Sequence, residues 1–276
     1  MPTPSQSLDK SHYVIRGGME GRARLRILSR VMWPSTLNLL QRAGIRAGMT
    51  CLDIGCGGGD VSCELAHLVG PSGRVIAMDI DDVKIAIARE EAAALNIPNL
   101  EFRVCNLCET EPTAEFDFVY ARFLLTHLPD PCSLVAKIRQ ALRPGGTFVV
   151  ADIDFRGYFS YPESPALARY VALYTEAVKR RGGDPNIGPR LPTILTAAGF
   201  ENVQMSVAQP AGLDGEVKLI SPLTMENIAD AVIAEDLASR TEIDRIVDEL
   251  YVYARMPGTI GCMPRVVESW GQRPPA

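Results

Sequence analysis

A glycine-rich stretch in the first quarter of the chain has the composition of a cofactor-binding loop. It covers residues 52–60 and reads LDIGCGGGD, and a second segment, residues 75–79, ends in Asp79 one strand–turn–helix unit later. Glycine lets backbone N–H groups approach a ligand that a Cβ would keep away. An acidic side chain at the next strand end can accept bonds from both hydroxyls of a ribose. The spacing predicts a site for a ribose-containing cofactor at the carboxyl edge of a sheet.

Two other glycine-rich loops fit this stretch less well. A dinucleotide-binding loop would read G-x-G-x-x-G from Gly55, which puts Asp60 where the third glycine belongs. A P-loop would need a Lys after its last glycine, and that Lys is absent. What remains is Asp53 at a strand end, followed by Gly55 and Gly57. This pattern suits a zwitterionic ligand, which needs backbone donors and a carboxylate.

The stretch resembles motif I of the class I S-adenosylmethionine-dependent methyltransferases, and further landmarks of that family follow in the same order. The matching segments are residues 52–60, 78–80, 106–107, 116–122 and 142–150. It is the order of the five landmarks that makes the resemblance specific. The leader at residues 13–26 also resembles small-molecule methyltransferases of the ubiquinone/menaquinone-biosynthesis type.

The resemblance implies a set of cofactor-binding residues. In that family the glycine loop passes the methionine part of the cofactor, Asp79 would hold the ribose diol, and the side chains after the second and third strands would contact adenine. Asn106 stands where the family usually has Asp, so it keeps an acceptor oxygen but lacks the charge. The leader would fold over the cofactor. The residues implied are Tyr13, Arg26, Asp53, Gly55, Cys56, Gly57, Asp79, Ile80, Asn106, Leu107, Ala121 and Arg122.

Methyl transfer asks little acid–base chemistry of the protein. The sulfonium is already activated, so the enzyme mainly aligns the acceptor and excludes water. If the acceptor must lose a proton, His127 after the fourth strand is the first candidate for a catalytic base, although a histidine there could equally be a packing residue. Asp152 and Asp154 could orient a substrate or act as a base, with surface capping as the alternative.

The elements that must position these residues alternate between strand and helix, which is typical of an α/β fold with a largely parallel sheet. Strands are predicted at residues 50–54, 74–79, 99–104, 116–121, 146–152, 201–208 and 263–270. Helices are predicted at residues 36–44, 59–69, 83–95, 131–142 and 188–198. The resemblance implies a Rossmann-like seven-stranded sheet in the order 3-2-1-4-5-7-6. Strand 7 would be antiparallel, with helices on both faces and an added helical lid.

The chain divides into a cap and one larger domain. Residues 1–46 are predicted to form an N-terminal helical cap, and residues 47–276 the S-adenosylmethionine-binding domain. Two lid insertions are expected, at residues 153–187 and 222–256. The first is rich in Tyr and Phe, which could form an aromatic pocket wall or only pack the added helices. Open α/β sheets bind ligands outside the carboxyl ends of their strands, which favours the wall.

Charge and hydropathy limit the partners. The net charge of the 276 residues is −5, but residues 1–46 carry eight Lys and Arg against two acidic residues. This basic arm could clamp an anionic substrate or the cofactor carboxylate, or form a solvated helix face opposite an acidic body. The remainder lacks the broad basic surface that nucleic acid requires. No charged-then-apolar leader and no run of about eighteen apolar residues appears, so a cytoplasmic protein without a membrane partner is expected.

The cysteines do not predict a metal site. Seven of them are scattered over expected core elements, an odd number that favours reduced thiols over a disulfide framework. Cys105 and Cys108 have C-x-x-C spacing, but they lack a second pair and overlap the expected adenine site. No metal is therefore expected.

The sequence favours one function and leaves a second open. The first is transfer of a methyl group from S-adenosylmethionine to an O, N or C centre of a small-molecule acceptor, with S-adenosylhomocysteine as product. The alternative is a protein that keeps this fold for a non-methylating step, such as a pericyclic or decarboxylative reaction, or for regulation. A nicotinamide-dependent oxidoreductase is disfavoured by Asp60. The acceptor stays open, and the added helices could form a homodimer surface as readily as a lid.

Overall fold

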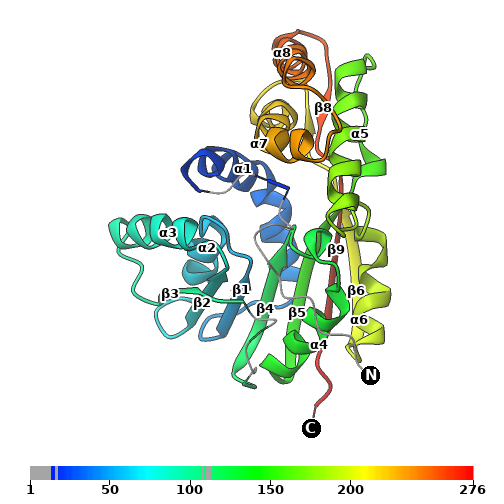
Figure 1. Ribbon diagram of the computed structural model, residues 1–276. Helices are drawn as coiled ribbons and strands as arrows, with labels where there is room; N and C mark the ends of the chain where they lie inside the picture. Colours follow the sequence, from blue (N-terminus) through cyan, green and yellow to red (C-terminus); the bar gives the residue numbers. More distant parts are fainter. Residues whose placement is uncertain (1–13, 16–17, 107–108, 110–112, 276) are drawn as a thin grey trace.

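A seven-stranded sheet with helices packed on both faces forms the centre of the molecule (Figure 1). The computed structural model describes residues 14–15, 18–106, 109 and 113–275. The strand order is β3-β2-β1-β4-β5-β9-β6, and β9 runs antiparallel to both of its neighbours. The predicted order is therefore confirmed, with β9 as the seventh strand. Within the described ranges no helix is both long and apolar enough to cross a membrane.

The strands fall close to their predicted ranges, although the fifth begins earlier. They are β1 (Thr50–Ile54), β2 (Arg74–Asp79), β3 (Leu100–Val104), β4 (Phe116–Arg122), β5 (Leu142–Asp154), β6 (Glu201–Ala208) and β9 (Arg265–Gln272). A separate small sheet pairs β7 (Ala211–Gly212) with β8 (Gly261–Cys262).

The helices include three that lie beyond the minimal sheet. The α-helices are α1 (Gly18–Arg42), α2 (Asp60–Val69), α3 (Asp82–Ala94), α4 (Pro131–Ala141), α5 (Pro165–Arg180), α6 (Leu191–Ala197), α7 (Ile220–Ala234) and α8 (Arg240–Arg255). Short 3-10 turns are η3 (Leu125–His127), η4 (Phe155–Gly157), η5 (Gly188–Arg190) and η6 (Glu216–Leu219).

Alternate side chains of the central strands face different helical layers, because successive residues of a strand point to opposite faces. On β1, Leu52 packs in the cluster that contains α4 and α6, whereas Cys51 packs in the cluster that contains α1 and α2. On β4, Ala121 belongs to the first cluster and Tyr120 to the second. A strand residue therefore reaches the α1 side of the sheet only at every second position.

The first helix is much longer than predicted. The sequence pattern predicted a helix over residues 36–44, but α1 spans Gly18–Arg42 and contains Pro34. Proline removes one helical hydrogen bond and would ordinarily end or kink a helix. Here Leu28, Met32 and Leu39 bury apolar surface on both sides of it, and tertiary packing of this kind outweighs local propensity. The helix passes from the sheet to α7, which it also contacts (Figure 1).

Helices α5, α7 and α8 form an extra layer at the carboxyl end of the sheet (Figure 1). Their shared core contains Tyr170, Tyr174 and Ile228, together with Phe155 just after β5. The rings of Phe155 and Tyr174 are stacked, with centroids 4.0 Å apart and planes inclined by 5°. These helices occupy the two predicted insertions. Their function as a lid stays a prediction.

Candidate active site

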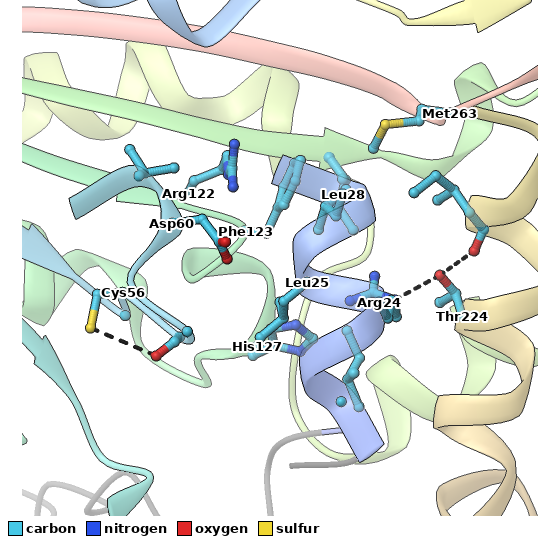
Figure 2. A pocket seen from close by; sticks show the side chains of 18 of the residues that line it. Arg24, Leu25, Leu28, Cys56, Asp60, Arg122, Phe123, His127, Thr224 and Met263 are labelled. Carbon is cyan, nitrogen blue, oxygen red and sulfur yellow. Dashed lines mark hydrogen bonds between the residues drawn. The ribbon is translucent and has the colours of Figure 1, made fainter. Parts of the chain in front are cut away.

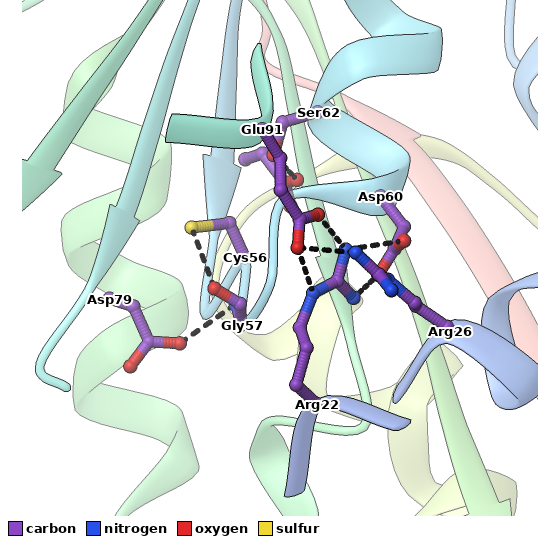
Figure 3. A network of polar contacts seen from close by, with 9 residues as sticks. Arg22, Arg26, Cys56, Gly57, Asp60, Ser62, Asp79 and Glu91 are labelled. Carbon is purple, nitrogen blue, oxygen red and sulfur yellow. Dashed lines mark hydrogen bonds and ion pairs between the residues drawn. The ribbon is translucent and has the colours of Figure 1, made fainter. Parts of the chain in front are cut away.

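The glycine-rich loop joins β1 to α2 and contacts the end of β2. Backbone N–H groups of Gly55 and Cys56 donate to the carbonyl of Met78 at 2.8 and 3.0 Å. The N–H of Gly57 donates to Oδ2 of Asp79 at 2.9 Å (Figure 3). Gly57 has φ +56°, in the left-handed region that favours glycine. The loop and the acidic strand end, which are 22 residues apart, are therefore in direct contact.

Asp53 lies beneath this loop and lines the same cavity. Its Oδ2 accepts a hydrogen bond of 2.6 Å from the hydroxyl of Ser62 on α2. Burial raises the pKa of Asp53 to about 6, although the bond from Ser62 and the charge of Arg122 oppose the rise. The carboxylate is thus mostly ionised at neutral pH, and it supplies the negative charge that a cationic ligand at this loop would need.

A cavity that opens to solvent extends from the loop to the extra helical layer (Figure 2). The glycine loop and Asp79 form one part of its lining, and α1 contributes Arg24, Leu25 and Leu28. Aromatic residues of the first insertion form another part, namely Phe155, Tyr158, Tyr170 and Tyr174. Phe159 and Tyr161 are exposed and do not line it. The cavity therefore joins a cofactor-type loop to an aromatic wall.

His127 lines this cavity from η3, where only 2% of it is exposed. Burial, together with the positive charges of Arg24 and Lys84, lowers its pKa to about 3. The imidazole is consequently neutral at physiological pH. A group with so low a pKa is a weak base, because general-base catalysis is most efficient when the pKa lies near the working pH. His127 is suited to hydrogen bonding with a ligand more than to removing a proton from it.

Asp152 was predicted either to orient a substrate or act as a base, or only to cap the surface, and the structure places it outside the cavity lining. Val149 and Ala151 of β5 belong to the cluster on the α1 side, and Ile153 lines the cavity, so Asp152 points to the opposite face of the sheet. Its Oδ2 accepts from the N–H of Thr126 at 3.1 Å. Asp152 therefore positions the turn that carries His127 and does not line the cavity.

Asp154 also lies outside the cavity lining. It is buried and pairs with Arg156 at 2.7 Å and with Arg265 at 3.3 Å. The pair with Arg265 joins the end of β5 to the start of β9. A structural role therefore accounts for Asp154 without any contact to substrate.

Arg26 was predicted to approach the methionine carboxylate, but it lies on the outer face of α1. Its side chain is half exposed and pairs with Glu91 of α3, and it does not line the cavity (Figure 3). Arg22, one helical turn earlier on the same face, pairs with both Asp60 and Glu91. Residues four apart share a helix face, whereas Arg24 lies between them and points the other way. The arginine of α1 that lines the cavity without a carboxylate contact is Arg24.

Two more of the predicted cofactor residues follow strand β4. Arg122 lines the cavity, and its Nη1 donates to Oγ1 of Thr36 at 3.3 Å. Ala121 faces the α4 side and does not line the cavity, so any contact it made to a ligand there would be through its backbone.

The predicted adenine contacts lie near Asp79 but outside this cavity. Ile80 follows β2, and Asn106 follows Cys105, whose N–H donates to the carbonyl of Asp79 at 3.0 Å. Nδ2 of Asn106 donates to Oε1 of Glu109 at 2.9 Å. Neither Ile80 nor Asn106 lines the cavity. Leu107 and Tyr13 fall outside the described residues.

Several lining residues were not singled out from the sequence. The clearest are Arg24, Lys84, Thr224 and Met263. Helical phase could have separated Arg24 from Arg22 and Arg26, provided that the helix had been predicted far enough towards its start. Thr224 and Met263 carry no comparable signal, because they are brought to the cavity from distant parts of the chain.

The residues present fit S-adenosylmethionine. The carboxylates of Asp53 and Asp79 match the positive charge and the ribose hydroxyls of this ligand, and the guanidinium of Arg122 matches its carboxylate. A Cβ at Gly55 would come within 3.1 Å of the side chain of Leu124, and the left-handed φ of +70° there adds to the requirement for glycine. The packing of Leu124 and the backbone conformation therefore both require glycine at position 55.

Comparison with known proteins shows the family to which this chain belongs. Residues 45–180 match a family model described as a methyltransferase domain. The chain is also 30% identical over 180 residues to demethylmenaquinone methyltransferase from Oceanobacillus iheyensis, covering 60% of this chain and 75% of that protein. The chain therefore belongs to the S-adenosylmethionine-dependent methyltransferases. It spans about half the length of several other curated relatives that it matches, between 46% and 53%.

Solved structures share the fold at low sequence identity. Geranyl diphosphate C-methyltransferase from Streptomyces coelicolor, solved with geranyl diphosphate and S-adenosylhomocysteine, is 15% identical with a TM-score of 0.55, covering 91% of this chain and 83% of that one. The [4+2]-cyclase SpnF is 17% identical with a TM-score of 0.54, covering 88% and 82%. Both likenesses concern architecture alone, since one is to a methyltransferase and the other to a cyclase.

Proposed function

We propose that this chain transfers a methyl group from S-adenosylmethionine to a small-molecule acceptor bound in the cavity between the glycine loop and the aromatic wall. The observation that carries the proposal is the continuity of this cavity. One side of the cavity contains Asp53, Gly57 and Asp79, and the other side contains the tyrosines of the extra helical layer. The cofactor, when bound, supplies an electrophilic methyl group on a sulfonium. The contribution of the protein would be to position the two reactants and to exclude water from them.

The protein residues divide into two sets by what they would hold. Asp79 and the loop would bind the ribose and the methionine part, with Arg122 nearby as a cation for a carboxylate. Leu25, Phe123 and the aromatic wall would enclose the acceptor and keep water away from the reacting atoms. Alignment of two bound reactants can supply several kcal/mol of a barrier, on the order of 7–11 kcal/mol in well-oriented cases.

The acceptor must be able to react without losing a proton to a strong protein base. His127 is a weak base, and Asp152 points away from the cavity. Of the three carboxylates that line the cavity, Asp53 is bound to Ser62, Asp79 to Gly57 and Asp60 to Arg22. The site therefore favours acceptors that ionise readily in water over alcohols or protonated amines, which would need a stronger base.

Calorimetric titration of the purified chain with S-adenosylmethionine and S-adenosylhomocysteine tests the proposal, after mass spectrometry of the protein for a copurified cofactor. Binding in the micromolar range is expected, within the span usual for enzyme ligands. Folded protein that binds neither compound would refute it. Binding of both, with no transfer of labelled methyl groups across a panel of phenols, enols and carboxylic acids, would favour a non-methylating use of the fold.

A further inference from the structure

Arg24 is a buried cation without a carboxylate partner. Only 8% of the residue is exposed, and it forms no ion pair with any carboxylate of the described chain. Burial lowers the pKa of Arg24, partly offset by Tyr170, Tyr174 and Tyr158, but an arginine remains charged at neutral pH. Burying an unpaired charge is costly in a folded protein. Such a group is therefore expected to have a counter-charge in the working state.

Arg22 shows what the same helix does with a structural arginine. It is 6% exposed and lies two residues before Arg24. Burial alone would lower its pKa, but hydrogen bonds to Glu91 and Asp60 outweigh this effect and raise it. Among the described residues, two carboxylates therefore contact Arg22 and none contacts Arg24. The difference lies in what each faces, since Arg24 lines the cavity.

The guanidinium of Arg24 is held in a fixed orientation. Its Nε donates to Oγ1 of Thr224 on α7 at 2.9 Å, and that hydroxyl donates in turn to the carbonyl of Ile220 at 2.6 Å (Figure 2). Neither of its two Nη groups is hydrogen-bonded to another described residue. They are the ends of a planar fork that matches two oxygens of a carboxylate or phosphate. A side chain fixed at Nε with its fork open is arranged for ligand binding.

The carboxylates that line the cavity lie on one side of it. Asp53, Asp60 and Asp79 belong to the glycine-loop side. Arg24 instead acts electrostatically on the tyrosines and on His127. Two lining cations belong to the same side: Arg122, whose charge acts to lower the pKa of Asp53, and Lys84, which pairs with Asp81 at 3.5 Å. A carboxylate of the cofactor therefore has a cation closer to its own binding loop, and Arg24 is left for the second molecule.

We infer that Arg24 binds an oxyanion of the methyl acceptor, whose apolar planar body lies against Tyr170 and Tyr174. The oxyanion is a carboxylate, a phosphate or an ionised phenol or enol. This inference rests on the proposed function and narrows its substrate class. Tyrosine clusters can also attract cationic amines through their ring faces, but a guanidinium among them repels a cation. An acceptor that is already ionised also agrees with a site whose histidine is a weak base.

The test compares matched anionic and neutral probes on three proteins. Affinity for S-adenosylhomocysteine is measured first for the natural chain, Arg24→Gln and Arg30→Gln, where Arg30 is an exposed residue of α1 paired with Glu216. Benzoate against benzamide, and phenyl phosphate against phenol, are then titrated by ligand-observed NMR with and without S-adenosylhomocysteine. In at least one pair the natural chain and Arg30→Gln should bind the anion tenfold or more tightly than the neutral partner. Arg24→Gln should lose that preference and keep its cofactor affinity within twofold.

Each other outcome overturns a defined part of the reasoning. Equal affinity for anions and neutral probes in the natural chain, or a preference that survives in Arg24→Gln, refutes the acceptor site. A fivefold or greater loss of S-adenosylhomocysteine affinity in Arg24→Gln alone would assign Arg24 to the cofactor carboxylate instead. Failure of the natural chain to bind S-adenosylhomocysteine would count against the proposed function, while the probe titrations without it would still report on Arg24.

A stability measurement separates ligand binding from a structural role. Because Arg24 has no carboxylate partner, Arg24→Gln without ligand should melt no lower than Arg30→Gln. A clearly lower melting temperature would mean that Arg24 mainly stabilises the fold, and would overturn the inference. Arg24→Lys serves as a second variant, since it keeps the charge without the fork. It should show an anion preference between those of the natural chain and Arg24→Gln.

Discussion

The contact between Asp79 and the glycine loop allows a quantitative prediction for Asp79→Asn. In the natural chain Oδ2 accepts from Gly57 N–H and Oδ1 accepts from Asp81 N–H, each at 2.9 Å. Every carboxylate oxygen has a further lone pair, so both can also accept from a ribose hydroxyl. The asparagine has one acceptor oxygen and no charge. If that oxygen keeps the bond to Gly57, the amide NH2 group must face the N–H of Asp81.

The loss is that of a charge-assisted hydrogen bond to the ribose, about 1.5–3 kcal/mol. Affinity for S-adenosylhomocysteine should therefore fall by roughly tenfold to 150-fold. Calorimetric titration measures it, with Asp117→Asn as the control. Asp117 is also a sheet carboxylate, bonded to Thr50 N–H and Arg143, but it lies on the second residue of β4, away from the carboxyl edge. A folded Asp79→Asn protein that binds within twofold of the natural chain would show that Asp79 does not hold the ribose.

Three further predictions concern charge and burial. In His127→Gln the pH–rate profile of methyl transfer should keep its shape between pH 5 and 8, because the pKa of His127 is lowered to about 3. If the variant lost an inflection that the natural chain shows in this range, His127 would be the catalytic base. Burial raises the pKa of Asp152 to about 7 from 3.8, so its ionisation costs the folded state stability as pH rises between these values. The free energy of unfolding of Asp152→Asn, measured by denaturant titration, should therefore rise relative to that of the natural chain by up to roughly 4 kcal/mol between pH 4 and pH 7. A difference between the two proteins that does not change with pH would contradict this. Arg22→Gln should lose about 2–3 kcal/mol of stability, since Asp60 and Glu91 lose a shared partner but stay partly solvated; unchanged thermal unfolding would refute it.

Local sequence determined the part of the site made by one supersecondary unit. The glycine loop, the strands on either side and Asp79 are close along the chain, and their conformations depend on glycine, on alternation of apolar residues and on short connections. The strand order followed from the matching landmarks. These features could be read without knowing how distant segments meet.

Tertiary structure decided which side chains face the cavity. Because side chains alternate along β5, Ile153 lines the cavity and Asp152 points away from it. On α1, Arg24 faces the cavity, whereas Arg26 lies on another face and pairs with Glu91. Neither could be read locally, because α1 continues through Pro34 only by virtue of the apolar surface it buries. The low pKa of His127 likewise arises from burial and from cations on other elements. The sequence alone determined the cofactor loop, whereas packing determined the charge that meets the acceptor.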